Sequence, residues 1–397
     1  MKARDRLILI IVVAFGFAMR APITVVPLII DQLARGLHAS VSNLGILTTI
    51  PLVMFLSFSV VAAKEMTRFG LRKALNFGLA ALLAGACLRL WISWPTILLG
   101  TVLVGLGITH VNVLTPSVVS SYEPQRVASY TTSYSTAICL GTAIMSLLAG
   151  PLNEHFGWQS VLWSLMIVCA IPFVLWLFAP KSDYELRLSK RAEKSPSVKK
   201  GKLTDLLKSR YTWAFLIMFG SQSIINYTLI AWLPVLMKYH GFAQGQISVV
   251  LSCYSFAGLP VSLFLPRFLD GAKERTQAAI SWTISLIALA GAILMFWQSQ
   301  MPLAFWYYLS ITAGALTAVF FIMALTLFPL KTTTPQKTAQ LSGLTQSGGY
   351  FIAAFGPMLY GAAYKANPLG IGQTIAYVLM IALCLLSSLI VIKMPKI

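Results

Sequence analysis

The sequence predicts an all-α protein that crosses a membrane with twelve helices. Of its 397 residues, 57% are hydrophobic and only 10% are charged, and the mean hydropathy is +0.79, whereas a soluble domain carries about 25% charge. The apolar residues form runs of about 18 to 26 residues, the length that a helix needs to cross about 30 Å of hydrocarbon. These runs are too long, and alternate too little, for the strands of a membrane barrel.

The expected helices fall into two groups of six. We expect them over residues 7–30, 42–63, 74–93, 95–120, 126–148 and 159–178, and then over 212–236, 246–266, 277–297, 302–328, 338–363 and 372–393. Between the groups, residues 181–211 hold ten basic and four acidic residues and the segment KSPSVKKGK. The sequence therefore predicts an N-terminal six-helix bundle over 1–180, a basic cytosolic linker over 181–211 and a C-terminal six-helix bundle over 212–397.

The first apolar run, Leu7 to Ile30, has the position of a secretory signal. It is too long for the hydrophobic region of a signal peptide, it contains Arg20, and no small-residue cleavage site follows it. We therefore expect a first transmembrane helix that stays in the mature protein.

The distribution of basic residues predicts the orientation in the membrane. The net charge is +19, with 30 Lys and Arg residues. Three of these fall in segments expected outside (Arg35, Lys238 and Lys365) and two fall within helices, which leaves 25 on the side of the N-terminus. Cytoplasmic loops carry such an excess of basic residues. The charge thus indicates a multi-pass protein of the bacterial inner membrane with both termini in the cytoplasm, and it does not indicate a nucleic-acid partner.

The sequence contains no residue pattern typical of an enzyme or a cofactor site. The five cysteines fall inside apolar runs at irregular spacing, which is typical of reduced packing residues. The four histidines are scattered, no glycine loop of an ATP site is present, and no two carboxylates share a helix face. We therefore expect no enzyme activity, no metal and no cofactor.

The fifth and eleventh expected helices look like copies of each other. They read TSYSTAICLGTAIMSLLAGPL and SGLTQSGGYFIAAFGPMLYG. Both are rich in small residues, and we expect each to end at a Gly-Pro pair, Gly150-Pro151 and Gly356-Pro357. A duplicated six-helix unit is the layout of transporters that rock two bundles around a central site, and small residues let such helices approach closely.

The segment after the second helix, AKEMTRFGLRKAL from Ala63, resembles the signature of the major facilitator superfamily. That signature reads Gly-x-x-x-Asp-Arg-x-Gly-x-basic-basic, and it is matched at Arg68, Gly70, Arg72 and Lys73. Ala63 replaces its glycine and Thr67 replaces its aspartate. The resemblance implies a conformational role for this segment, but the aspartate that latches the outward-facing state in the family is missing. The alternative is a basic cytoplasmic loop with a turn glycine.

Four further segments resemble the cyanate and nitroimidazole porter branch of that superfamily. They are MRAPITVVPLI, GLGITHVNVLTPSVV, IAWLPVLMKYHGF and AQLSGLTQSGGYFIAAFGPMLYG, and they span both halves. The resemblance implies the major facilitator fold and the transport of a small solute. It also implies that Arg20 belongs to a recurring Met-Arg-x-Pro segment and that Asn112 and Pro116 have family counterparts. Members of the branch differ widely in what they carry.

Arg20 is the first candidate for binding the solute, because it lies midway along the first helix. A guanidinium there costs at least about 2.5 kcal/mol and scarcely deprotonates. No carboxylate is expected deep within any helix. We therefore expect Arg20 to face a watery cavity and to bind carbonyl oxygens or an anionic or dipolar substrate, since its fork suits a planar anion. The alternative is an arginine that hydrogen-bonds neighbouring helix backbones.

His110 and Asn112 lie midway along the fourth helix. The unperturbed pKa of histidine lies near physiological pH, so His110 is the candidate for coupling transport to protons. The alternative is a buried neutral histidine with one hydrogen bond. Asn112 offers a donor and an acceptor to a ligand, or joins two helices.

In the second half, two polar pairs are each spaced by one helical turn. Gln222 and Asn226 share a face of the seventh helix, and Gln346 and Tyr350 share a face of the eleventh. These side chains suit the wall of a pocket for a small planar anion or a polar heterocycle. Trp232 is expected to be an interfacial anchor.

Three more residues bear on the first helix and its surroundings. Pro22 and Pro27 each remove an intrahelical hydrogen bond, so we expect a kink near Arg20 that exposes carbonyls or aids packing. Arg89, late in the third helix, is expected to snorkel to the lipid headgroups or to draw anions toward the entrance.

These observations favour a secondary active transporter of a small anionic or polar solute that works by alternating access as a monomer in the lipid bilayer, with protons as the candidate coupling ion. The Gly-Pro pair of the fifth helix also fits a multidrug or metabolite efflux pump of the same superfamily. A polytopic sensor or enzyme is disfavoured because the soluble segments are short.

Overall fold

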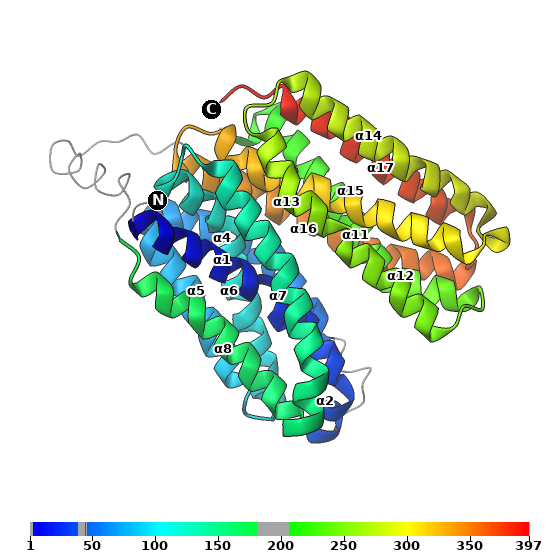
Figure 1. Ribbon diagram of the computed structural model, residues 1–397, viewed down its shortest axis with the longest axis horizontal. Coiled ribbons are helices and arrows are strands. Elements are labelled where there is room, and N and C mark those ends of the chain that lie inside the picture. Colours follow the sequence, from blue (N-terminus) through cyan, green and yellow to red (C-terminus); the bar gives the residue numbers. More distant parts are fainter. Residues whose placement is uncertain (1–2, 39–43, 45, 181–205, 397) are drawn as a thin grey trace. The chain divides into compact units, whose positions relative to one another are not determined.

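The computed structural model describes all residues except 1–2, 39–43, 45, 181–205 and 397, and the described part is almost entirely helical, without a strand (Figure 1). Eleven of its helices are long and apolar enough to cross a membrane. A twelfth long helix, α16 (Pro335–Ala366), is more polar in its first half. The predicted fold class, an all-α polytopic membrane protein, is confirmed.

The long helices of the first half are α1 (Ala3–Thr24), α4 (Ile46–Phe69), α5 (Leu71–Leu88), α6 (Trp94–Tyr122), α7 (Val127–Phe156) and α8 (Trp158–Leu177). Between α1 and α4 lie the short helices η1 (Val26–Ile29) and α2 (Ile30–Gly36). The second half contains α11 (Arg210–Tyr239), α12 (Gln244–Phe256), α13 (Gly258–Leu269), α14 (Glu274–Leu294), η2 (Met295–Gln300), α15 (Leu303–Leu330), α16 and α17 (Ile371–Ile392). Helices α12 and α13 meet at Ala257 and together supply one span.

Two expected boundaries in the first half are wrong. The first helix ends at Thr24 instead of residue 30, close to the prolines that predict a kink. The second helix continues to Phe69, so the expected signature loop is reduced to Gly70. Gly70 has φ +89°, in the left-handed region that side chains other than glycine rarely adopt, and this lets α5 begin at once.

The expectation that Gly-Pro pairs end two helices is also wrong. Helix α7 continues past Pro151 to Phe156, and α16 continues past Pro357 to Ala366. A proline inside a membrane helix is tolerated because neighbouring helices and local adjustments satisfy the freed backbone groups.

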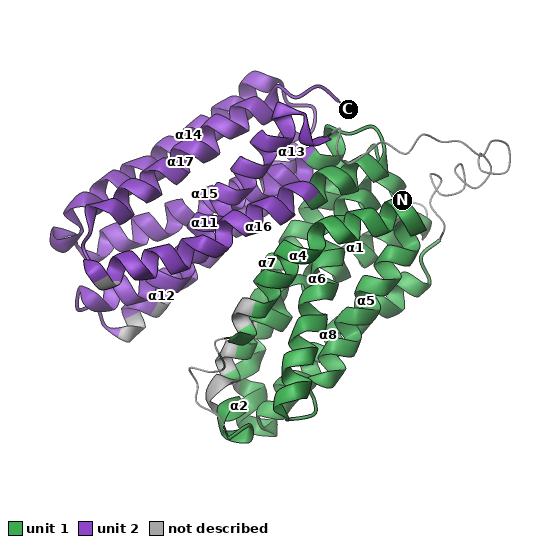
Figure 2. Cartoon of the chain, turned by 180° about the vertical axis from the view of Figure 1, so that it is seen from behind, with its two compact units in different colours: residues 1–202, 328–343 green, residues 203–327, 344–397 purple. Residues whose placement is uncertain are grey.

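The chain forms two compact units (Figure 2). Unit 1 comprises residues 1–202 and 328–343, and unit 2 comprises 203–327 and 344–397. The ends of α15 and α16 around residues 328–343 thus cluster with the first unit, and a Cβ added at Gly343 would lie 2.7 Å from the Ser59 carbonyl oxygen of α4. Most of the expected linker, 181–211, lies outside the described residues, and the division into bundles of six helices stays a prediction.

Helices α5 and α6 of unit 1 pack very closely because glycines line their contact. A Cβ added at Gly107 would lie 2.5 Å from the Leu82 Cβ and 2.6 Å from the Gly78 carbonyl oxygen. A Cβ at Gly85 would lie 2.6 Å from the Gly100 carbonyl oxygen. Small residues at such contacts let helix backbones approach where hydrophobic burial contributes little to association.

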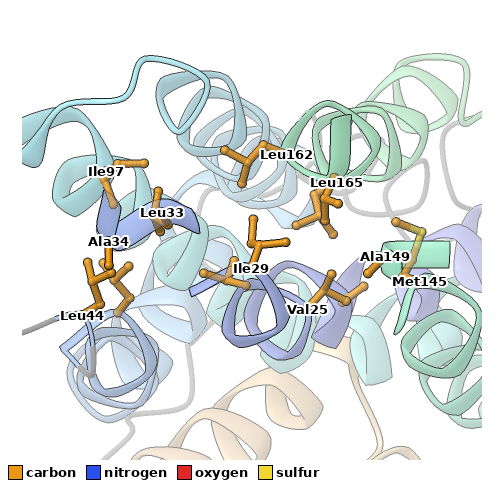
Figure 3. Close-up of a cluster of buried hydrophobic side chains, with 14 of the residues drawn as sticks. Val25, Ile29, Leu33, Ala34, Leu44, Ile97, Met145, Ala149, Leu162 and Leu165 are labelled. Atoms are coloured by element: carbon orange, nitrogen blue, oxygen red, sulfur yellow. The ribbon is translucent and has the colours of Figure 1, made fainter. Parts of the chain in front are cut away.

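A cluster of buried apolar side chains holds the segment that follows α1 (Figure 3). Val25 and Ile29, from the break and η1, belong to this cluster together with side chains of α6, α7 and α8, among them Ile97, Met145 and Leu165. The cluster fixes the chain where α1 ends, and so fixes the end of the helix that carries Arg20.

We expect Gly107→Ala to lower the thermal unfolding temperature of the purified protein, because overpacking a close contact costs about 1–3 kcal/mol. Gly372→Ala is the matched control, since a Cβ at Gly372 in α17 would meet no atom within 4 Å. Unfolding in detergent, followed by tryptophan fluorescence, measures both. Equal stability of Gly107→Ala and the control would contradict the close packing of α5 and α6.

Candidate functional site

A polar cluster joins three helices of unit 1 around Arg20. Tyr134 of α7 donates from its hydroxyl to the Asn112 Oδ1 of α6 over 3.3 Å. The charge of Arg20 on α1 acts on the same hydroxyl. Tyr134 and Asn112 are 2% and 7% exposed, and Arg20 is half-buried. We call Arg20, Asn112 and Tyr134 the unit 1 polar cluster.

One predicted residue, Asn112, thus contacts a tyrosine that the sequence did not single out, and another, Arg20, lies within electrostatic range of the same hydroxyl. The sequence feature that could have pointed to Tyr134 is its position in the fifth expected helix, which is rich in small residues. The Arg20 guanidinium and the Asn112 amide group are hydrogen-bond donors, while the single Tyr134 hydroxyl proton is directed at the Asn112 Oδ1. Such a set is suited to a ligand with electronegative acceptor atoms.

Arg89 braces the end of α1. Its Nη1 donates to the Pro22 carbonyl oxygen over 2.7 Å, and its Nε and Nη2 donate to the Thr101 Oγ1 over 3.3 and 3.0 Å. The side chain is 5% exposed, so the expected snorkelling is wrong. Pro22 lies in the last turn of α1, where carbonyl groups lack intrahelical donors. Arg89 supplies the missing donor and thereby connects α5 and α6 to the helix that carries Arg20.

His110 of α6 is fully buried, and both of its ring nitrogens have partners. Nδ1 lies 2.9 Å from the Leu106 carbonyl oxygen, and Nε2 lies 2.9 Å from Glu65 Oε2. The sequence placed Glu65 in a loop or at a helix end, because the second helix was expected to end at residue 63. Since α4 continues to Phe69, Glu65 lies within the helix and reaches the core residue His110. The expectation that no carboxylate approaches the helix interior is therefore wrong for Glu65.

The signature-like segment connects α5 to α8. Arg72 Nη1 donates to the Ala179 carbonyl oxygen over 2.7 Å, and Nη2 donates to the Leu177 carbonyl oxygen over 3.2 Å. Carbonyl groups at the end of a helix bind cations favourably because the helix dipole is negative there. Arg72 therefore anchors the C-terminal end of α8.

The other residues of this segment have local environments. Thr67, at the aspartate position of the signature, contacts through its hydroxyl the Ala63 and Lys64 carbonyl oxygens of its own helix, each at 2.9 Å. The Arg68 guanidinium lies 5.1 Å from the Phe69 ring centre, and Lys73 is exposed. Thr67 is thus engaged within α4 in this structure.

A second polar cluster lies in unit 2. Tyr254 of α12 donates to the Asn226 Oδ1 of α11 over 3.1 Å, and its hydroxyl lies 3.2 Å from the Thr317 Oγ1 of α15. We call Asn226, Tyr254 and Thr317 the unit 2 polar cluster. Each unit thus contains a tyrosine hydroxyl that donates to an asparagine amide oxygen across two helices.

The remaining predicted residues of unit 2 lie on α11 and α16. Gln222 is 3% exposed, and its Nε2 donates to the neighbouring Ser223 Oγ over 2.7 Å. Gln346 is fully buried and Tyr350 is 5% exposed. The Tyr350 ring centre lies 5.3 Å from that of Phe219 and 6.3 Å from that of Tyr227. Tyr350 of α16 thus packs against aromatic side chains of α11.

The Gly-Pro pair of α16 marks a close contact with α11. A Cβ at Gly356 would lie 2.6 Å from the Thr228 Oγ1, and the Pro357 carbonyl oxygen accepts from the Trp232 Nε1 over 3.0 Å. Trp232, expected as an interfacial anchor, therefore joins two helices of unit 2. In α7, the corresponding Gly150 and Pro151 lie within the continuous helix.

Comparison with known proteins identifies relatives over almost the whole chain. Residues 7–357 match the family described as Major Facilitator Superfamily. The chain is 28% identical to the 2-nitroimidazole transporter of Escherichia coli (strain K12) over 92% of this chain and 91% of the relative. It is 30% identical to the uncharacterized transporter YycB of Bacillus subtilis (strain 168), over 94% and 89% of the two chains. Identity to the cyanate transport protein CynX of Escherichia coli (strain K12) is 22%, over 89% and 88%.

The fold also matches solved structures. The proton:xylose symporter XylE, bound to 6-bromo-6-deoxy-D-glucose, superposes with a TM-score of 0.79 over 98% of this chain and 95% of that one, at 12% identity. At this identity, the likeness concerns the fold alone. The resemblance inferred from the sequence segments, to the superfamily and to its cyanate and nitroimidazole branch, is confirmed by the relatives.

We expect Arg89→Ala to destabilise the protein by about 1–3 kcal/mol, because the buried Pro22 carbonyl loses a charged donor. Arg89→Lys should recover only part of this loss, since an ammonium lacks the fork that reaches both Pro22 and Thr101. Arg267→Ala, at an exposed arginine of α13, is the control. Thermal unfolding of the three variants measures the effect, and wild-type stability of Arg89→Ala would show that the brace is dispensable.

Proposed function

This chain belongs to the major facilitator superfamily, and from that premise we propose that it is a secondary active transporter of a small anionic or polar solute. The solute class is that of cyanate, small organic anions and nitro-heterocycles. Transport proceeds by alternating access across the bacterial inner membrane, with both termini in the cytoplasm, and no second subunit is required.

The observation that carries this proposal is the unit 1 polar cluster. Arg20 lies in a helix whose other residues near it are apolar, and a guanidinium in such a place is costly unless it serves a function. Its planar fork binds two acceptor atoms at once, which suits a carboxylate, a nitro group or a similar anion. Asn112 and Tyr134 add directional hydrogen bonds beside it. We propose Arg20 and Asn112 as substrate-binding residues.

In unit 2, we propose Gln222, Asn226, Gln346 and Tyr350 as further substrate-binding residues. Neutral amides and an aromatic face provide hydrogen bonds and stacking without a second charge. A planar heterocycle fits such surroundings better than a long hydrophobic cation does.

The names of two relatives support this solute class. One is named for 2-nitroimidazole and another for cyanate. Both are small molecules with electronegative acceptor atoms that a guanidinium binds well. The shared acceptor chemistry, and not either compound, is what we extend to this chain.

The energy source that we propose is the proton gradient, with His110 as the coupling residue and the solute and proton moving together. The conformational residues are proposed to be the signature positions, Pro22 and the two Gly-Pro pairs. Of these, Arg72 anchors α8, and the Pro22 and Pro357 carbonyls are each bound by a side chain from a neighbouring helix.

A ligand screen tests the anchor role of Arg20. We expect cyanate, small carboxylates or nitroimidazoles to raise the unfolding temperature of the purified protein, with about 2.7 kcal/mol of stabilisation at 100 times the dissociation constant. Arg20→Ala should abolish this shift, and Arg20→Lys should weaken it, because lysine offers a point charge without the fork. Arg267→Ala, an exposed arginine exchanged in the same way, should behave as the wild type.

Two outcomes would contradict the proposal. Full affinity of Arg20→Lys would exclude two-pronged anion binding. Stabilisation by hydrophobic cations alone, equal in the wild type and Arg20→Ala, would make Arg20 structural and would favour drug efflux instead.

A further inference from the structure

We propose that His110 and Glu65 together hold one shared proton, and that this proton joins α6 to α4. The role of this proton in transport rests on the proton coupling proposed above. The binding of the proton itself follows from the hydrogen-bond geometry of the pair.

The two ring nitrogens of His110 face different acceptors. Nδ1 lies 2.9 Å from the Leu106 carbonyl oxygen, and Nε2 lies 2.9 Å from Glu65 Oε2. A carbonyl oxygen carries no proton and accepts hydrogen bonds only. The proton of the first contact must therefore reside on Nδ1.

This assignment determines the second contact. In a neutral imidazole with its proton on Nδ1, Nε2 carries a lone pair. An ionised carboxylate also offers only lone pairs, so the two atoms at 2.9 Å would repel each other. A proton must lie between them, either on Nε2, giving an imidazolium and a carboxylate, or on Glu65, giving a neutral imidazole and a carboxylic acid. Both forms have a net charge of zero, and loss of the proton leaves a net charge of −1.

Burial favours this shared proton over two separate charges. His110 is fully buried and the Glu65 side chain is 26% exposed. A lone charge in a low-dielectric interior is costly, whereas a proton-bridged pair has no net charge. Glu65 is the more exposed residue of the pair, so the proton enters and leaves through its carboxyl group.

Residues of α5 pack against the His110 ring and fix its position. The Phe77 ring of α5 contacts the imidazole at 5.3 Å between ring centres, edge to face. Gly78 of α5 lies against the His110 Cβ so closely that any larger residue would displace the ring. The imidazole therefore has little freedom to turn away from Glu65.

Other charged groups on the packed elements are engaged elsewhere or exposed. On α4, Lys64 and Arg68 are exposed, and Lys337 of the α16 segment in unit 1 is partly exposed.

On α5, Arg72 donates to the end of α8, Lys73 is exposed, and Arg89 donates to Pro22 and Thr101. Cys87 of α5 is partly exposed. On α6 itself, Tyr122 donates to the Pro180 carbonyl oxygen. Tyr134 of α7 donates to Asn112 of α6, and the charge of Arg20 on α1 acts on this Tyr134 hydroxyl.

The shared proton gives the pair a mechanical consequence. Helices α4 and α6 pack side by side (Figure 1), and the bridged pair is a hydrogen bond between them. Deprotonation turns that hydrogen bond into a repulsion between two lone pairs. Proton occupancy and the packing of α4 against α6 are therefore linked, as required of a group that couples a proton to a conformational change.

Nitrogen NMR of the full-length protein in detergent, with labelled histidine side chains, tests the proposal. His110→Gln identifies the signals of His110 among those of four histidines. In the wild type, we expect a protonated Nδ1 and a proton shared between Nε2 and Glu65, so that His110 and Glu65 lose and gain this proton as a pair. In Glu65→Gln, the amide can donate to Nε2, so the ring should stay neutral and the shared proton should be lost.

Matched controls lie at the exposed end of α7. His155→Gln and Glu154→Gln exchange the same side-chain types and should leave the His110 titration unchanged. An unprotonated Nδ1 in the wild type, or an unaltered His110 titration in Glu65→Gln, would overturn the proposal. If His110→Gln fails to fold, the wild type and Glu65→Gln still test the proposal. The histidine signal that differs between these two proteins is then the signal of His110.

The same proteins separate this inference from the proposed function. Uptake of labelled cyanate into proteoliposomes, with and without an imposed proton gradient, measures transport. Titration of the pair without stimulation of uptake by the gradient would leave the proton site in place and refute the coupling. If a proton gradient stimulates uptake but the His110 titration is unchanged in Glu65→Gln, proton-coupled transport stands and the shared proton of His110 and Glu65 is refuted.

Discussion

The constraint on which the rest of this structure depends is that a polar group inside an apolar helix bundle must find its partner within the protein. In hydrocarbon, an unsatisfied carbonyl or donor costs several kcal/mol because no water replaces the lost hydrogen bond. The described contacts of Arg89, Arg72, Trp232 and the two tyrosines of the polar clusters follow from this constraint. Each connects one helix to a backbone or side-chain group of another.

The same constraint explains how α1 can be interrupted near Arg20. The helix ends at Thr24, the Pro22 carbonyl is bound by Arg89, and the following segment is held by an apolar cluster with Ile29. A break of this kind costs little when its polar groups are bound and its apolar side chains are buried. It fixes the end of α1 four residues beyond Arg20, so Arg20 lies on a supported helix.

Close packing and polar contacts complement each other in unit 1. Glycines such as Gly107 allow α5 and α6 to approach, and Gly78 holds α5 against His110. Their combined effect is to hold the imidazole between the Leu106 carbonyl oxygen and Glu65. A proton-bridged pair between two closely packed helices can switch between two states. With the proton the contact between His110 and Glu65 is attractive, and without it the contact is repulsive.

Apolar run length and the charge pattern determined the number and type of helices, because the thickness of the membrane and the cost of charge within it leave few alternatives. The candidate residues Arg20, His110 and Asn112 were also evident from the sequence, since polar groups are rare in such helices. Only the tertiary structure decided which polar groups meet: Tyr134 with Asn112, Glu65 with His110, and Arg89 with Pro22. The physical reason is that these contacts join different helices, separated by 22, 45 and 67 residues. A helix's own period fixes which side chains share its face, but not which neighbour that face meets.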